Sequence, residues 1–446
     1  DHKYDPFTQE DYYRLFAFFN NVNEFGEDGR VANAVPMMPS PTSEQGQALE
    51  SLEAKFQSAS QERSQFLAKQ TMPSVNALAQ AQARMSLPAL PEPVWKISDP
   101  QETEASPLEN TENPLSAPGI HGDALVASPR NGIGQVEKKA NVFEEKTDAF
   151  AIAFWMRPES SSPKNAPLLS NARYESNPTS SDYGKGWDIR IVDGEIQFTI
   201  GNRYPAYSIM LRTRFAKIRP EQWRHIAVSF TGRTEADDAY TPASRFRIYI
   251  DGEENRLSVL HDGMQNMPKD RDQAILLGSD TFPDGNRFIG RLDELQQFGM
   301  ALSPEQVARV FEADALDYAA SISHSMELTS REENWAKIAV SNQGTDTRWK
   351  RIDSDYRNTR SKLLDLERAI PTTMVMQERE EMRDTFVLDR GSYDSPKNKV
   401  EPGVPEDWLA PWPQNAPRNR LGLAQWLTQA NNPLTALVVV NRFWQQ

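Results

Sequence analysis

The chain of 446 residues contains no cysteine. Disulfides, thiolate catalysis, zinc held by cysteines and a covalently attached c-type haem are therefore excluded within it. Its five histidines, at positions 2, 121, 225, 261 and 324, lie far apart and form no zinc-binding spacing such as His-Glu-x-x-His. No apolar run reaches the roughly 18 residues that a membrane-spanning helix needs, so the sequence predicts no membrane span.

Positive charge is also scarce, since the formal net charge is −14. A nucleic acid backbone would be repelled, and we expect no nucleic acid partner. Hydrophobic residues make up 38% of the chain, which is low but not typical of a disordered protein. The 31 prolines gather at 36–41, 88–118 and 396–417, which we interpret as joints between segments.

The middle of the chain has the pattern of β-strands. Two alternating runs in 187–200 are joined by Asp193-Gly194, and the run 246–250 is followed by Asp251-Gly252. An Asp-Gly pair is a strong signal for a tight hairpin, because both turn positions need a positive φ. A slip of the apolar alternation between Leu292 and Leu295 predicts a β-bulge near Asp293 and Glu294. Short strands without alternating helices predict an antiparallel sandwich, so the chain is mainly β with flanking helices.

Two segments that bracket this region have heptad patterns typical of long helices. The first lies in 43–68 and the second in 349–370, and their similar length suggests that they pair antiparallel. We expect a helical hairpin, an arm that carries the sandwich at its tip. The alternative is two unrelated amphipathic helices. The apolar seam residues are Leu49, Leu52, Phe56, Ala59 and Phe66, with Arg63 as a polar intrusion, and Trp349, Ile352, Tyr356, Leu363, Leu366 and Ile370.

The order of motifs over 150–310 resembles the laminin-G-like, or concanavalin-A-like, jelly roll. This resemblance implies an antiparallel jelly-roll β-sandwich, which we place at 91–316. The segments that carry it are Phe150–Pro158, Pro167–Ser170, Trp223–Phe230, Tyr249–Gly252, Ile275–Gly278, Phe288–Leu295 and Leu302–Val307.

Both ends of the chain resemble a second group of proteins. Asp-His-Lys-Tyr-Asp-Pro-Phe-Thr at 1–8, with 11–22, looks like the end of the planctomycete-type cytochrome-associated domain. The segments 374–378, 384–391 and 418–444 look like the start of the planctomycete domain of unknown function that follows it. The resemblance implies a secreted or periplasmic protein of planctomycetes or related bacteria.

In the cytochrome-associated family a Cys-x-x-Cys-His motif directly precedes the Asp-His-Lys. A haem c is therefore expected only upstream of residue 1, where His2 would lie beside it; the alternative is a structural histidine. This segment has no cysteine and therefore contains no attachment motif for haem c. A helical face formed by Tyr12, Leu15, Phe16 and Phe19 cannot bury itself in so short a segment, and we expect it to contact a flanking domain.

These observations divide the chain into five expected segments. They are the end of the cytochrome-associated domain at 1–40, the first arm helix at 41–90, the sandwich at 91–316, the second arm helix at 317–370, and the truncated start of the C-terminal domain at 371–446.

No catalytic residue is predicted. Glycoside hydrolases of this shape need two carboxylates on one side of a cleft, and neither Glu-x-Asp-x-Glu nor Glu-x-Asp-x-x-Glu occurs. The nearest strand pair, Asp293 and Glu294, is adjacent, and adjacent strand residues face opposite sides unless a bulge intervenes.

The laminin-G-like resemblance implies a calcium ion at the sandwich rim, held by oxygen ligands. Candidate ligands are Asp182, Asp188, Asp280 and Asp284, with solvated loop carboxylates as the alternative. Sugar binding would use exposed aromatic rings. The candidates in the loop-rich stretch 171–210 are Tyr174, Tyr183, Tyr204 and Tyr207, whereas Trp187 is expected in the core.

Three functions stay open at this point. The first is a non-catalytic recognition module, with a polysaccharide or cell-surface glycan as its partner, in a haem-associated multidomain protein. The second is a fragment of an enzyme or electron-transfer protein of polysaccharide breakdown whose active residues lie in flanking domains. The third is a structural spacer.

Overall fold

The chain divides into two compact units, one of residues 25–374 and one of residues 1–24 and 375–446. The computed structural model describes residues 7–22, 37–85, 91–98, 108–109, 115–128, 133–136, 149–174, 183–204, 207–233, 241–264, 273–282, 285–322, 328–379, 381–405 and 409–445. None of the helices in these ranges combines the length and the apolar composition that a membrane crossing requires.

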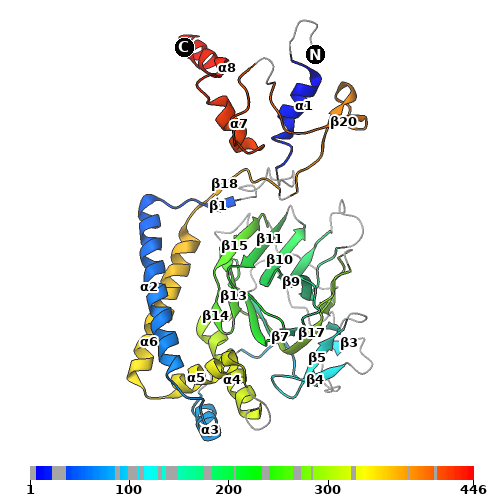
Figure 1. The fold of residues 1–446 in the computed structure, drawn as a ribbon. Coiled ribbons are helices and arrows are strands. Elements are labelled where there is room, and N and C mark those ends of the chain that lie inside the picture. The colour runs from blue at the N-terminus through cyan, green and yellow to red at the C-terminus, as the bar shows by residue number, and fades with distance from the viewer. Residues whose placement is uncertain are drawn as a thin grey trace. The chain divides into compact units, whose positions relative to one another are not determined.

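The larger unit contains a sandwich of two eight-stranded sheets (Figure 1). Within each sheet, every strand pairing described is antiparallel. Sheet I has the order β15 (Leu257–Asp262), β11 (Tyr207–Thr213), β10 (Glu195–Arg203), β9 (Gly186–Val192), β8 (Asn165–Ser170), β16 (Ile275–Leu277), β6 (Gly134–Val136) and β3 (Leu108–Glu109). Sheet II has the order β14 (Glu253–Glu254), β13 (Phe246–Ile250), β12 (Arg224–Phe230), β7 (Phe150–Pro158), β17 (Gly290–Phe298), β5 (Asp123–Ala127) and β4 (Ser116–Pro118), and β2 (Trp95–Ile97) also pairs with β17.

The core lies between the two sheets, as alternation predicts. Sheet I contributes Ile189, Phe198 and Leu211, and sheet II contributes Phe154 and Val228, all of them buried. Trp187 is buried in the same core, where we expected it. The predicted antiparallel sandwich is therefore present.

The predicted turns and bulge are confirmed. Asp193 and Gly194 have φ values of 52° and 81° between β9 and β10, and Asp251 and Gly252 have 54° and 75° between β13 and β14. These positive values explain why Asp-Gly occupies both turns. Between β17 and β7 the register shifts after Asp293, and Glu294 has a φ of 47°.

Helix α4 (Pro304–Ile322) covers the outer face of sheet II. Strand β7 is therefore buried on both of its faces. Trp155 of β7 packs against Phe311 of α4, and Trp335 of α5 (Ser330–Gln343) closes the cluster. A second apolar cluster joins α4 and α5 to α3 (Val75–Arg84). In the turn before β5, His121 lies 3.4 Å from Asp314 of α4, which ties the sheet to the helix.

The two heptad segments form α2 (Ser43–Ala68) and α6 (Thr347–Ala369), which run antiparallel beside each other (Figure 1). Phe66 packs on Trp349, Phe56 packs on Tyr356, and the Gln45 side chain reaches the carbonyl oxygen of Ala369. The strands β1 (Met37–Pro39) and β18 (Thr372–Met374) pair at the end of these helices.

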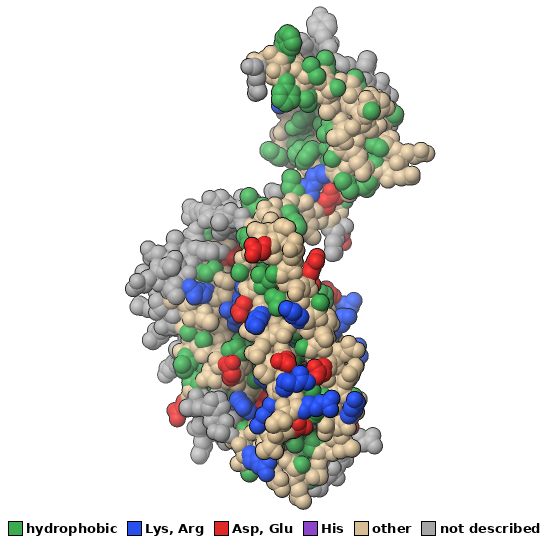
Figure 2. All heavy atoms as spheres, turned by 90° about the vertical axis from the view of Figure 1, so that its left-hand side faces the viewer, with side chains coloured by type: hydrophobic (Ala, Val, Ile, Leu, Met, Phe, Trp, Pro, Cys, Tyr) green, Lys and Arg blue, Asp and Glu red, His purple; other side chains and the backbone are tan. Residues whose placement is uncertain are grey.

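The expectation of a sandwich at the tip of an arm is wrong, because the helix pair lies along the side of sheet II. Arg256 binds Glu53 of α2 at 2.8 Å, and Arg368 of α6 binds Glu254 at 2.5 Å. Figure 2 shows side chains of both charges interleaved over the face that α2 and α6 form. The heptad pattern identified the pairing, but it carries no information on these ion pairs to a third element. Helices α3 and α5 have no counterpart among the expected segments.

Arg63, the polar intrusion in the α2 seam, joins three elements. Its guanidinium binds Asp353 of α6 at 2.9 Å and Glu253 of β14 at 3.0 Å, and it lies 4.4 Å from the centre of the Tyr356 ring. Burial alone would raise the pKa of Glu253, but Arg360 and Arg63 hold it at about 2.

In the smaller unit, α1 (Gln9–Ala17) packs on the hairpin of β19 (Thr385–Leu388) and β20 (Pro396–Val400). Thr8 caps α1, since its hydroxyl accepts from the N–H of Asp11. Phe18 packs with Leu423 and Trp426 of α7 (Arg420–Leu427), and α8 is Pro433–Gln445. The predicted aromatic face of α1 is partly exposed.

Replacing Arg63 by Met should lower the free energy of urea unfolding of the larger unit by about 2 to 4 kcal/mol. The substitution keeps most of the side-chain volume but leaves two partly buried carboxylates short of a cation. Arg351→Met is the matched control, because Arg351 pairs with Glu62 on the surface and is 58% exposed. The control should change stability by less than about 1 kcal/mol. Equal effects of the two substitutions would show that Arg63 does not hold α2, α6 and β14 together.

His121 should make stability depend on pH. The hydrogen bond to Asp314 raises the pKa of His121 from 6.5 to about 9, and Glu294 and Asp317 add to this. Because folding raises this pKa, protonated His121 contributes its full stabilisation of the folded state below about pH 6.5. This contribution to the free energy of unfolding is lost as the pH rises to about 9. Between these pH values, the melting temperature of the wild type should fall by about 2 to 4 °C more than that of His121→Asn. Parallel melting curves for both proteins would contradict this assignment.

Candidate functional site

Three of the four tyrosines predicted to bind sugar meet at one end of sheet I. Tyr174 follows β8, Tyr183 precedes β9, and Tyr204 follows β10. The ring of Tyr174 lies 5.8 Å from each of the other two rings, edge to face, and Tyr183 and Tyr204 are 6.3 Å apart. We call Tyr174, Tyr183, Tyr204 and Phe282 the tyrosine cluster.

The backbone extends the β9–β10 hairpin pairing to hold this cluster. The N–H of Tyr204 donates to the carbonyl oxygen of Tyr183 at 2.7 Å. Gly184 lies between the rings with a φ of 71°, and a Cβ atom there would come within 2.1 Å of the Cβ of Tyr204. Only glycine fits this position, so the ring geometry depends on Gly184.

Tyr174 is the buried member of the cluster, and the other two tyrosine rings pack on it. It is 3% exposed, and its hydroxyl donates to Asp188 at 3.2 Å. Its N–H donates to the Thr281 hydroxyl at 2.8 Å, and the ring of Phe282 lies 5.1 Å away. Burial raises the pKa of Tyr174 well above its usual value, so the phenol stays protonated. Tyr183 and Tyr204 are only half-buried and leave ring surface accessible.

A buried ion triad supports Tyr174. Arg190 binds Asp188 and Asp280, each at 2.5 Å, and also reaches Asn165 at 3.0 Å. Asp188 and Arg190 are two residues apart on β9, so they share the face of sheet I that points away from the core. Although burial lowers the pKa of Arg190, Asp188 and Asp280 hold it above its usual value.

Two of the four predicted calcium ligands are therefore brought together, but around a guanidinium group. Asp188 and Asp280 both accept hydrogen bonds from Arg190. Asp182 and Asp284 lie outside the described residues. Within the described ranges, no group of three or more histidine or acidic side chains has a metal-binding arrangement. Calcium binding at these positions stays a prediction.

The remaining predicted residues lie elsewhere. Tyr207 starts β11 opposite Arg203 and, among the described residues, makes no ring contact with the tyrosine cluster. His2, the residue expected beside a haem, lies outside the described residues. Sequence reasoning missed Arg190 and Phe282. Arg190 left a signal, because a basic residue two places after an acidic one on a strand shares its face.

The adjacent carboxylates at the bulge are both buried and both engaged. Asp293 accepts the N–H of Ile120 at 2.6 Å, and Glu294 pairs with Lys96 at 2.7 Å. Burial raises the pKa of Asp293 to about 7, although the N–H of Ile120 opposes the shift. These contacts fix the β4–β5 turn and β2 on sheet II.

The comparisons with known proteins are consistent with this fold. Residues 131–308 match the family described as Concanavalin A-like lectin/glucanases superfamily. Residues 419–446 match a second family, Protein of unknown function (DUF1553). A search of curated proteins found no match.

Several solved structures are similar over about half of the chain. The binding domain of Paraclostridial Mosquitocidal Protein 1 is 17% identical, with a TM-score of 0.35 over 50% of this chain and 52% of that one. Domain 4 of AbnA, a GH43 extracellular arabinanase from Geobacillus stearothermophilus in complex with arabinotriose, is 20% identical, with a TM-score of 0.30 over 48% and 85%. The Ruminococcus gnavus IT-sialidase CBM40 is 14% identical, with a TM-score of 0.32 over 49% and 100%.

The chain thus spans about half the length of the first of these structures. At these identities and scores, neither a ligand nor a site is transferred from them to this chain.

Replacing Arg190 by Met should destabilise the larger unit by about 3 to 5 kcal/mol, because two buried carboxylates lose their shared cation. Adding Asp188→Asn should restore part of this loss, since it removes one of the unpaired charges. Arg212→Met is the control, because Arg212 lies two strands away on the same face and bonds only the neutral Gln197 among the partners described. Urea unfolding measures all three. A double variant less stable than Arg190→Met would contradict the charge explanation.

Proposed function

We propose that the sandwich is a recognition module that binds a neutral glycan through the tyrosine cluster. The observation that carries this proposal is the pair of partly exposed rings of Tyr183 and Tyr204, held by a third ring that is itself fixed to Asp188. Flat aromatic faces suit the C–H faces of sugar rings, and tyrosine hydroxyls add hydrogen bonds. The match of 131–308 to a family named for lectins and glucanases supports the same class of ligand.

Rigidity is the second argument for binding at this place. The rings are ordered before a ligand arrives, because each contacts Tyr174 and the backbone pairs on both sides of Gly184. A site organised in advance loses less conformational entropy on binding.

We also propose what kind of protein contains this module. The resemblance of the two chain ends to planctomycete cytochrome-associated proteins supports a secreted or periplasmic protein with a haem domain before residue 1. The match of 419–446 to a family of unknown function supports the C-terminal part of this interpretation. An enzyme in a flanking domain would then use the sandwich to hold its substrate.

A glycan array with the full chain, followed by calorimetric titration of the best binder, tests the proposal. Tyr183→Ala and Tyr204→Ala should each weaken binding at least about 10-fold, as expected for central aromatic contacts. Tyr393→Ala is the control, because Tyr393 is 94% exposed and belongs to the other unit. A folded chain that binds no glycan would favour the structural spacer, and variants that bind as well as the wild type would place the glycan away from the tyrosine cluster.

The same titration in the presence of a calcium chelator tests the calcium prediction. Arg190 already neutralises Asp188 and Asp280, so we expect unchanged glycan affinity. Loss of binding that added calcium restores would show that a metal site nevertheless operates at this rim.

A further inference from the structure

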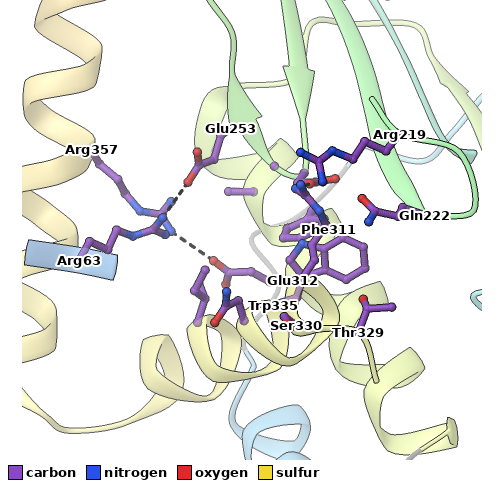
Figure 3. Close-up of a pocket in the computed structure, with 16 residues that line it drawn as sticks. Arg63, Arg219, Gln222, Glu253, Phe311, Glu312, Thr329, Ser330, Trp335 and Arg357 are labelled. Atoms are coloured by element: carbon purple, nitrogen blue, oxygen red, sulfur yellow. Dashed lines mark hydrogen bonds and ion pairs between the residues drawn. The ribbon is translucent and has the colours of Figure 1, made fainter. Parts of the chain in front are cut away.

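A cavity of about 590 Å³ lies between sheet II and the helices (Figure 3). Its walls come from the β13–β14 turn, the loop before β12, helices α4 and α5, and the pair α2 and α6. Arg219 and Gln222 extend from the sandwich side, and Arg63 and Arg357 from the helix pair, as the close-up shows. The volume is in the range of sites for small organic ligands.

The two sides of this cavity differ in how their charges are balanced. On the helix side, Arg63 binds Glu253 at 3.0 Å, and Arg357 reaches Glu312 at 3.3 Å. Glu253 and Glu312 thus each have an arginine partner in the wall. On this side the charges compensate one another, and no bound anion is needed.

On the sandwich side, positive charge is in excess. Glu253 of β14 is already paired with Arg63. The other carboxylate of the sandwich wall, Asp251, is shared by two arginines: Arg224 at 3.0 Å and Arg331 of α5 at 3.3 Å. Arg219 also lines the wall; it is exposed and makes no hydrogen bond or ion pair with another described residue. Burial and the neighbouring Arg224 lower the pKa of Arg331, the effect expected where anions are too few.

Unsatisfied polar atoms gather at the same place. The Nε of Arg331 and the Oε1 of Gln222 are buried with no hydrogen-bond partner, and both residues line the cavity. Helix α5 also begins here with Ser330, and its N-terminus already carries a capping box of Thr329 and Glu332. Buried groups of this kind are normally satisfied, so a ligand with matching groups is the physical expectation.

We propose that this cavity binds an acidic saccharide, a sugar that carries one carboxylate or sulfate. The anionic group lies between Arg219 and Arg331 near the start of α5. A sugar hydroxyl donates to Gln222 Oε1. The rings of Phe311 and Trp335 line the cavity and provide apolar surface.

The mixture of donors and acceptors selects this class of ligand. A bare inorganic anion accepts hydrogen bonds only, and it would leave Gln222 Oε1 unpaired. A neutral sugar would leave the surplus arginine charge uncompensated. The site belongs to sheet II and its helices, whereas the tyrosine cluster belongs to sheet I, so the two sites are independent.

Calorimetric titration of the full chain tests the proposal with a glucuronate disaccharide, galactose 6-sulfate, their neutral counterparts and sodium sulfate. At least one acidic sugar should bind about 10-fold more tightly than its neutral counterpart, and less tightly at high salt. Arg219→Met should reduce that affinity about 10-fold without loss of stability, since Arg219 has no described partner to leave unpaired. Arg331→Met should do the same, and the surface variant Arg351→Met should not.

Three results would overturn the proposal: equal affinity for acidic and neutral sugars, unchanged affinity in Arg219→Met, or sodium sulfate that binds as tightly as the sugar. Tyr183→Ala separates this site from the tyrosine cluster, because it should leave acidic-sugar binding unchanged. A loss of binding in Tyr183→Ala that Arg219→Met does not share would place the acidic sugar at the tyrosine cluster and reject the cavity.

Discussion

The outer face of sheet II is apolar, and the helical half of the larger unit is built on the need to cover it. Strand β7 buries both of its faces, so Trp155 meets Phe311 of α4 on the side away from the core. Helix α4 is then covered by α3 and α5, and the pair α2 and α6 joins the same sheet through Arg63. The cavity lies where these layers meet, beside the β13–β14 turn.

Local patterns were sufficient to predict the parts of this fold that depend on neighbours in sequence. The Asp-Gly turns, the bulge at Glu294 and the α2 and α6 seams all follow from backbone sterics or side-chain periodicity. The predicted arm failed for the opposite reason. Ion pairs such as Arg256 with Glu53 join residues about 200 positions apart, and no periodicity records them.

The candidate sites show the same division. The tyrosines were found from composition, because a loop-rich stretch with several aromatic residues stands out in a sequence. The arrangement of the tyrosines could not be predicted, because it depends on Thr281 and Phe282, which contact Tyr174 from over 100 positions away in the sequence. The surplus of arginine around Asp251 was hidden as well, because the net charge of −14 suggests an acidic surface everywhere. The net charge of a whole chain says little about a cavity wall built from segments that lie far apart in the sequence.

The pairing of α2 with α6 also bears on how the chain is made. Arg63 and its partner Asp353 are 290 positions apart. At translation rates of about 5 to 20 residues per second, α2 leaves the ribosome roughly 15 to 60 s before its partner. During that time the apolar seam of α2 is uncovered while the sandwich folds. The helix pair therefore closes only after the sandwich has been synthesised, and the seam of α2 has to be kept from aggregation until α6 arrives.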